Sequence, residues 1–211
     1  MKILFALFSS FTFSLVLFAS VQKIEEKNFV DLIRAAKNES LTMNERWQSL
    51  VQAAKSATPE KIEVIKNFST HPDWFMRNAA LVSLEAIGLE EAITQAKILI
   101  HDKALVVRSA AVSTLSKKHT LEIKRLFAEE LTKTYNFSGR QSLWIRSQMM
   151  QQIANLATRE DRQFMARYLF DPDKNVAAIS AATLEKITDI RFESNKNVEQ
   201  WQSYVKENKW L

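Results

Sequence analysis

The stretch "DKALVVRSAAVSTL", Asp102–Leu115, decides the fold, because it sets a single arginine, Arg108, among small and apolar residues. A guanidinium ion keeps its charge and carries five N–H donors, so a buried arginine needs carboxylate or carbonyl oxygens beside it. The planar arrangement of these donors explains why arginine, and not lysine, stands at such a position. The stretch therefore predicts a helix whose core side includes a charged group with a fixed set of acceptors.

The arginine recurs along the chain at a nearly constant period. The interval from Arg46 in "NERWQSLVQA" to Arg77 in "FMRNAALVSL" equals the interval from Arg77 to Arg108. Arg146 follows after a longer interval, and the original interval then leads to "VAAISAATL", where Ala177 replaces the arginine. Five repeats at this spacing predict a stacked array of helix pairs. The third repeat is the longer one, with its extra residues around "TYNFSGRQ".

The composition favours helices throughout. The chain has two glycines and three prolines in 211 residues, against an average use of about 7% and 5%, which argues against an all-β fold. All five lie between segments whose apolar residues recur every three or four positions, the period of a helix. We expect an all-α chain with short connections between antiparallel neighbours. The expected helices are 24–37, 43–56, 59–69, 74–87, 89–100, 103–117, 120–135, 140–157, 159–169, 174–187 and 196–209.

The repeated pattern resembles a known family. An Asp, an aliphatic residue followed by Arg, two small residues and a Leu resemble HEAT repeats, in particular the short bacterial type named after phycobilisome lyase. The clearest matches are "LIHDKALVVRSAAVSTL" and "LFDPDKNVAAISAATL", and the resemblance covers about 42–188. It implies a right-handed, armadillo-like α-solenoid of about five helical hairpins. Inner helices, expected at 59–69, 89–100, 120–135 and 159–169, would then line a concave face.

The resemblance also implies a role for the arginines. In HEAT repeats the Asp of a turn and the Arg of the outer helix pair between neighbouring repeats. We therefore expect Arg108 to meet an acid of an adjacent turn, such as Asp73 or Asp102. The residues expected in this structural ladder are Asp73, Arg77, Asp102, Arg108, Arg146 and Asp171.

The N-terminus is a different kind of sequence. Segment 1–20 has one cation, Lys2, followed by a run from Ile3 to Ala19 without charge, Gly or Pro, which is typical of a signal peptide. Large residues, Leu17 or Phe18, would stand three positions before the cleavage site, so an uncleaved membrane anchor at 3–19 is the alternative. We expect an exported, periplasmic protein. The absence of cysteine agrees with export and excludes disulfides and Cys-ligated metal sites.

Two flanking segments complete the expected organisation. Residues 21–41 would form an N-terminal helix or cap before the array at 42–188, and 189–211 would form a C-terminal cap. In the latter, Val198, Trp201 and Val205 share one apolar stripe with Tyr204. We expect this helix to cover the end of the last repeat.

The search for chemistry gives no catalytic set. The three histidines are His71, His101 and His119, and the first two stand at repeat-equivalent turns, too far apart to converge on one metal ion. The sequence contains no HExxH motif, glycine-rich phosphate loop or Ser-His-Asp order. We expect no enzymatic activity, no metal and no cofactor.

The expected function is a scaffold or adaptor of the cell envelope, because stacked repeats build extended binding surfaces. We expect a monomer that binds an unidentified protein on its inner helices, through charges of both signs that suit protein recognition. The candidate partner-binding residues are Lys124, Arg125, Glu129, Arg162 and Arg167.

Tryptophans accompany three of the repeat arginines. Trp47, Trp74 and Trp144 each lie within three residues of one. We expect them to pack in the core or between repeats, with an exposed binding position as the alternative.

A nucleic-acid enzyme is the second interpretation. "HPDWFMRNAALVSL" locally resembles the HEAT-like alkylpurine DNA glycosylases, which place a Trp shortly before an Arg in a similar helix. The charges of the inner helices at 59–69 and 121–135 each balance to zero, so they lack the basic stripe that phosphates require. A third interpretation, a lyase or accessory factor for a chromophore, rests on the name of the repeat alone.

Overall fold

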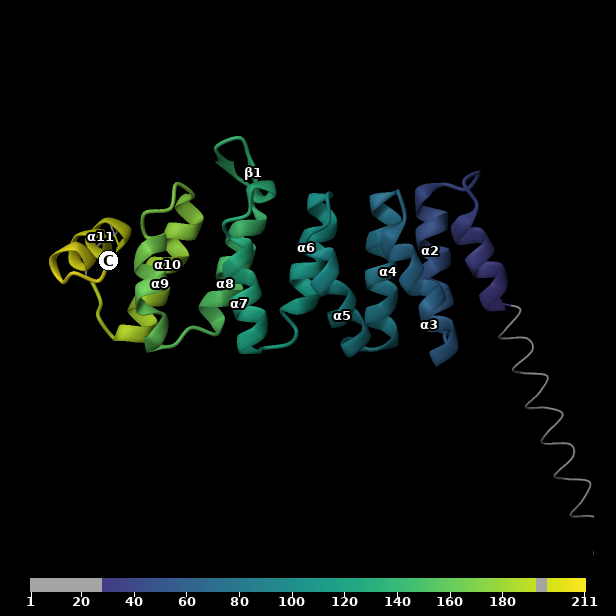
Figure 1. Cartoon of the computed structure of the whole chain (residues 1–211), viewed down its shortest axis with the longest axis horizontal. Helices are drawn as coiled ribbons and strands as arrows, with labels where there is room; N and C mark the ends of the chain where they lie inside the picture. Colours follow the sequence, from purple (N-terminus) through teal and green to yellow (C-terminus); the bar gives the residue numbers. More distant parts are fainter. Residues whose placement is uncertain (1–27, 193–196) are drawn as a thin grey trace, which may run out of the picture. The chain divides into compact units, whose positions relative to one another are not determined.

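The computed structural model describes residues 28–192 and 197–211, and the expected leader at 1–20 lies outside these ranges. The described part is helical apart from one two-stranded hairpin (Figure 1). It divides into two compact units, which we call unit 1 (Met1–Gln95) and unit 2 (Ala96–Leu211). No helix within the described ranges is long and apolar enough to cross a membrane.

Unit 1 is built from helical residues 28–37 and the helices that follow them. These are α2 (Met43–Ala54), α3 (Pro59–Lys66), the short 3-10 helix η1 (Asn67–Thr70), α4 (Trp74–Ile87) and the beginning of α5 (Leu89–Leu99). A capping box between Thr42 and Glu45 starts α2, and Pro59 occupies the first turn of α3. Helices α2 and α3 pack against α4, and the apolar side chains between them are buried.

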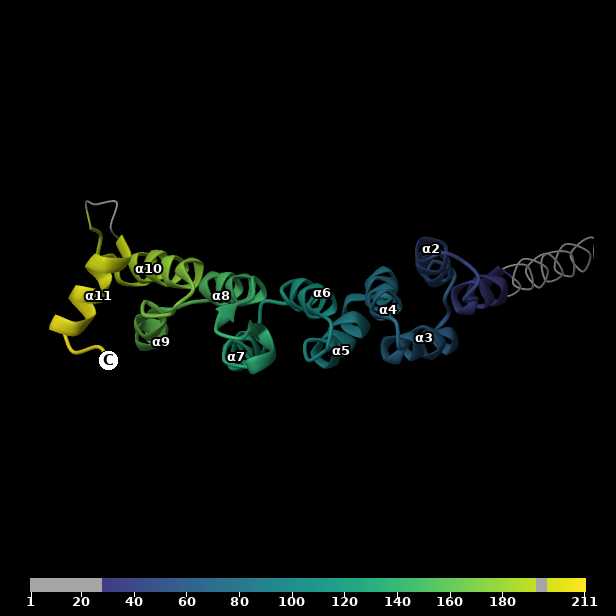
Figure 2. The same ribbon diagram turned by 90° about the horizontal axis from the view of Figure 1, so that it is seen from above.

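Unit 2 has two layers of helices. Its elements are α6 (Leu105–Leu115), α7 (Leu121–Glu130), η2 (Thr134–Asn136), β1 (Phe137–Ser138), β2 (Gln141–Ser142), α8 (Ile145–Asn155), η3 (Arg159–Asp161), α9 (Arg162–Tyr168), α10 (Lys174–Thr188) and α11 (Asn197–Glu207). Helices α6, α8 and α10 pack in sequence as the first layer, while α7 packs on α8 and α9 packs on α10 as the second layer (Figure 2).

The longer third repeat differs most from the expected helix boundaries. Helices were expected at 120–135 and 140–157, but α7 ends at Glu130 and α8 begins at Ile145. The residues between them form η2 and the antiparallel hairpin β1–β2. Gly139 turns this hairpin with a φ of 60°, a conformation that glycine adopts without steric cost. Strands of two residues are too short to show an alternating pattern in sequence.

The C-terminal helix α11 packs against α10 and α9. Trp201 and Val205 are fully buried, whereas Val198 and Tyr204 are partly exposed. The rings of Tyr204 and Trp210 lie 5.6 and 6.0 Å from that of Trp201. The expected apolar stripe therefore buries its central Trp and one Val.

Candidate functional site

Two of the repeat arginines close the turns that precede their own helices. Arg77 and Arg108 are almost fully buried. From Nη1 each donates to the backbone carbonyls six and five residues earlier, at 2.8 and 2.8 Å for Arg77 and 2.7 and 3.2 Å for Arg108. The same geometry thus recurs at positions that stand one period apart in the sequence. The turn carbonyls gain charge-assisted hydrogen bonds at a point where they would otherwise be poorly satisfied.

A second feature of the turns also recurs. His71, Asp102 and Asp171 each lie six residues before an arginine or, for Asp171, before Ala177. Each accepts the backbone N–H of the second residue after it, at 3.0, 2.7 and 2.9 Å respectively. This local hydrogen bond is the usual way in which an Asp fixes a turn, and in unit 1 the imidazole Nδ1 takes its place.

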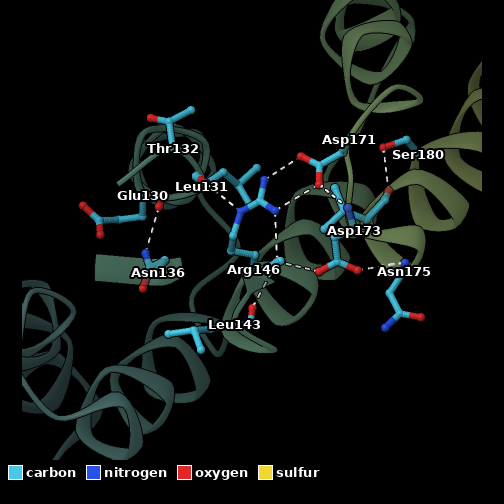
Figure 3. A network of polar contacts seen from close by, with 12 residues as sticks. Glu130, Leu131, Thr132, Asn136, Leu143, Arg146, Asp171, Asp173, Asn175 and Ser180 are labelled. Atoms are coloured by element: carbon cyan, nitrogen blue, oxygen red, sulfur yellow. Dashed lines mark hydrogen bonds and ion pairs between the residues drawn. The ribbon is translucent and has the colours of Figure 1, made fainter. Parts of the chain in front are cut away.

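Ion pairs connect two of the arginines to a later turn. Arg46 donates to Asp73 at 3.1 Å in unit 1. In unit 2, Arg146 donates to both carboxylate oxygens of Asp171, at 3.0 and 2.6 Å (Figure 3). Only 3% and 8% of these two side chains are exposed, and Arg146 also donates to the carbonyl of Leu131 at 2.8 Å. The second pair is a forked, buried contact of the kind that arginine forms and lysine does not.

The hydrogen bonds of Arg108 differ from the expected contact with a carboxylate. It meets the backbone carbonyl of Asp102 in the turn before it, and in the turn after α7 it donates to the side-chain oxygen of Asn136 at 3.1 Å and the carbonyl of Tyr135 at 2.7 Å. The Tyr135 ring lies 5.2 Å from the guanidinium carbon. The turn of the longer repeat carries Tyr and Asn where the next one carries Asp171, so this arginine donates to neutral oxygens, while the charges of Asp102 and Glu130 act on it from nearby.

A histidine, a tyrosine and a buried glutamate lie together beside this turn. Tyr135 Oη donates to Glu130 Oε2 at 2.5 Å, and His101 Nδ1 lies 3.2 Å from Glu130 Oε1 and 3.1 Å from Tyr135 Oη. Only 1% of the Glu130 side chain is exposed. Burial and the hydrogen bond to Glu130 raise the pKa of Tyr135, so the phenol keeps its proton. The cluster ties the end of α7 to the turn before α6, and its members are too distant in sequence to be grouped by a motif.

The described residues contain no metal-binding group. No three His, Asp or Glu side chains in 28–192 and 197–211 are placed to hold an ion. The histidine nearest to acids, His101, shares its Nδ1 side with Glu130 and Tyr135. The Nδ1 atom of His101 is therefore engaged by these two side chains.

Lys124, a candidate partner-binding residue, does not lie on a free surface. Its Nζ donates to both carboxylate oxygens of Asp161, at 2.8 and 2.9 Å, and only 14% and 17% of the two side chains are exposed. Burial alone would raise the pKa of Asp161, but hydrogen bonds from Lys124 and Thr158 together lower it. Lys124 therefore joins α7 to η3, a contact between distant parts of the sequence that periodicity does not reveal.

The other four candidates are exposed on the second layer of unit 2. Arg125 and Glu129 lie on α7, and Arg162 and Arg167 lie on α9. The Arg162 guanidinium stacks over the Trp210 ring at 4.5 Å. Within the described part of the chain, no ion pair or hydrogen bond engages the side chains of Arg125 and Arg167. The structure thus places these four side chains on one layer and removes Lys124 from the set.

Two of the tryptophans expected in the core or between repeats are exposed, as in the alternative interpretation. Trp74 and Trp144 expose 43% and 54% of their surface, whereas Trp47 is half-buried and its Nε1 lies 3.4 Å from Asn78 Oδ1. Trp74 is the first residue of α4 and Trp144 directly precedes α8, so both exposed tryptophans lie at the start of a helix, next to the turn.

No protein-family model matches the sequence, and no curated protein matches it. The likeness to HEAT repeats therefore rests on the sequence pattern alone.

Proposed function

We propose that this protein is a non-catalytic adaptor made of HEAT-like helical hairpins and that it binds a protein partner. The proposal rests on the recurring turn, in which Arg77 and Arg108 make the same pair of carbonyl contacts. Such repetition is expected of hairpins stacked in a right-handed solenoid, because the stacked units share one internal structure. The buried arginines stabilise the turns of the hairpins, and the exposed helix faces remain available for binding a partner.

The proposed binding face consists of the exposed sides of α7 and α9. It presents the guanidinium groups of Arg125 and Arg167 together with Glu129. Two large apolar side chains at the helix ends, Leu121 and Phe170, expose 61% and 40% of their surface. Arginine beside exposed apolar surface is the composition that protein interfaces favour.

The proposed location is the cell envelope. The leader-like segment 1–20 would direct the chain out of the cytoplasm as a periplasmic protein, or 3–19 would anchor it in a membrane.

The arginine of the segment that resembles a DNA glycosylase argues against that function. Arg77 is 5% exposed, and its Nη1 already serves two turn carbonyls. An arginine in this position has little surface to offer a phosphate, although Trp74 beside it is exposed. These contacts therefore argue against the glycosylase and leave the adaptor as our proposal.

The test is capture of a partner by the purified full chain from an envelope extract, followed by measurement of the affinity of the isolated complex. The double variant R125E/R167E should weaken binding at least about tenfold, since arginine is enriched among the interface residues whose removal costs about 2 kcal/mol or more. The control is K55E/K103E, which makes the same change of net charge at exposed positions away from α7 and α9.

Equal affinity of R125E/R167E and the unaltered chain would show that this face is not the binding site. Tight, salt-sensitive binding to duplex DNA together with base release from alkylated substrate would replace the adaptor by the glycosylase.

A further inference from the structure

The insertion in the third repeat contains the hairpin β1–β2, which borders the first layer of unit 2 and which we call the wall. The hairpin β1–β2 stands between α7 and α8 in the chain and projects beside the start of α8 (Figure 1). Ser142 Oγ donates to Asp173 Oδ2 at 2.6 Å, which fastens β2 to the start of α10. On the other strand, the Phe137 ring lies 4.4 Å from the Arg146 guanidinium carbon. The hairpin is therefore held at both strands by residues of α8 and α10.

A groove lies between this wall and the first turns of α8 and α10. It has a volume of about 580 Å³, and its lining includes Arg140, Leu143, Trp144, Pro172, Lys174 and Asn175. A second hollow of about 480 Å³ continues between α8 and α10, and Trp144 and Asn175 border both. Volumes of this size fall in the range of ligand-binding clefts.

Trp144 stands at the junction of the two hollows with 54% of its surface exposed. Around it the lining includes the apolar side chains of Leu143 and Pro172 in the first hollow and of Ala178 and Ile179 in the second. An accessible indole with apolar neighbours is typical of the few residues that dominate an interface energetically. The groove therefore has an anchor position for one apolar side chain.

The charge of the lining is positive. Arg140 and Lys174 are exposed, and in the described part of the chain no hydrogen bond or ion pair occupies either side chain. The acid beside them, Asp173, is already engaged, because it accepts from Ser142 Oγ and from the backbone N–H of Asn175. Carboxylates on a ligand would complement these two cations.

We propose that this groove binds a short, extended, acidic segment of another protein, with an apolar side chain of that segment on Trp144 and its carboxylates on Arg140 and Lys174. A glycan would also stack on an indole, but the two exposed cations beside Trp144 favour a partner that carries carboxylates. The groove belongs to the first layer, so this inference does not depend on the α7 and α9 face.

The experiment is fluorescence anisotropy of a labelled hexapeptide, Asp-Glu-Phe-Leu-Glu-Asp, titrated with the full chain. Two control peptides replace the acids by Lys and Arg, or the central pair by Ser-Gly. We expect saturable binding of the acidic peptide with a Kd below about 1 mM, and at least about tenfold weaker binding of both controls.

Two variants locate the site. W144A and R140E/K174E should each weaken binding of the acidic peptide at least about tenfold, while K55E/K103E should change it less than about twofold. The altered side chains are exposed, so circular dichroism should show all three variants folded.

Unchanged binding by W144A, equal binding of the basic peptide, or no saturation below about 1 mM would each overturn the proposal. Trp144-dependent binding of an N-acetylglucosamine oligosaccharide without binding of the acidic peptide would assign the groove to glycans instead.

Discussion

Arg108 and Arg146 hold the same place in successive repeats of the sequence, yet different groups surround them. Arg146 makes a forked contact with Asp171, and both side chains are buried. Arg108 is equally buried but donates to three backbone carbonyls and to the amide oxygen of Asn136. The two arginines show that burial of a guanidinium requires acceptors of suitable geometry, while the charge of those acceptors depends on the turn that follows.

The difference predicts unequal costs of truncation. Arg146→Ala should produce the largest loss, roughly 3–5 kcal/mol, because it leaves the Asp171 carboxylate buried without its cation. Urea unfolding of the variant, followed by circular dichroism, measures this loss.

The double variant R146A/D171N serves as the control, since it removes the stranded charge and should recover part of the stability. If R146A and R146A/D171N were equally unstable, the ion pair would not be the source of the effect.

Arg108→Ala should cost less, roughly 1–3 kcal/mol, because it strands neutral oxygens instead of a carboxylate. The same unfolding measurement applies, with R146A in parallel. A loss as large as that of R146A would mean that the acids near Arg108, which include the buried Glu130, depend on its charge as Asp171 depends on Arg146.

The sequence predicts the repeated helices better than it predicts the inserted hairpin. The recurrence of apolar residues every three or four positions predicted helices at the positions of α4 and α10. The hairpin was missed, since a single glycine at a φ of 60° and two strands of two residues leave almost no periodic signal.

The residues of the candidate site were also predictable only in part. Exposure of Arg125 and Arg167 agrees with a helical face read from the sequence. The pairing of Lys124 with Asp161 could not be foreseen, because the two are brought together only by packing of α7 near η3. Likewise, Trp144 was expected in the core or between repeats, whereas it borders the groove beside the hairpin with 54% of its surface exposed.

The smallest expected effect comes from the turn of unit 1, where His71 takes the position that Asp171 has in unit 2. Burial, with a smaller contribution from the Arg46 charge, lowers the pKa of His71, although Asp73 acts in the opposite direction. The imidazole also accepts the backbone N–H of Asp73 at Nδ1, a bond that protonation of that nitrogen abolishes.

The unfolded chain therefore binds more protons at His71 than the folded chain does once the pH falls below the ordinary histidine value of about 6.5. The contribution of neutral His71 to stability should be fully present above that pH and should decline as the pH falls toward the lowered pKa of the folded state. Thermal unfolding at about pH 7.5 and about pH 5.5 should show a modest fall in Tm for the unaltered chain. The variant His71→Asn keeps a side-chain acceptor at this position but does not titrate, so the fall should be smaller in H71N. An identical pH dependence in the two proteins would assign the acid sensitivity to other groups and would leave His71 with only the local hydrogen bond that Asp171 makes in unit 2.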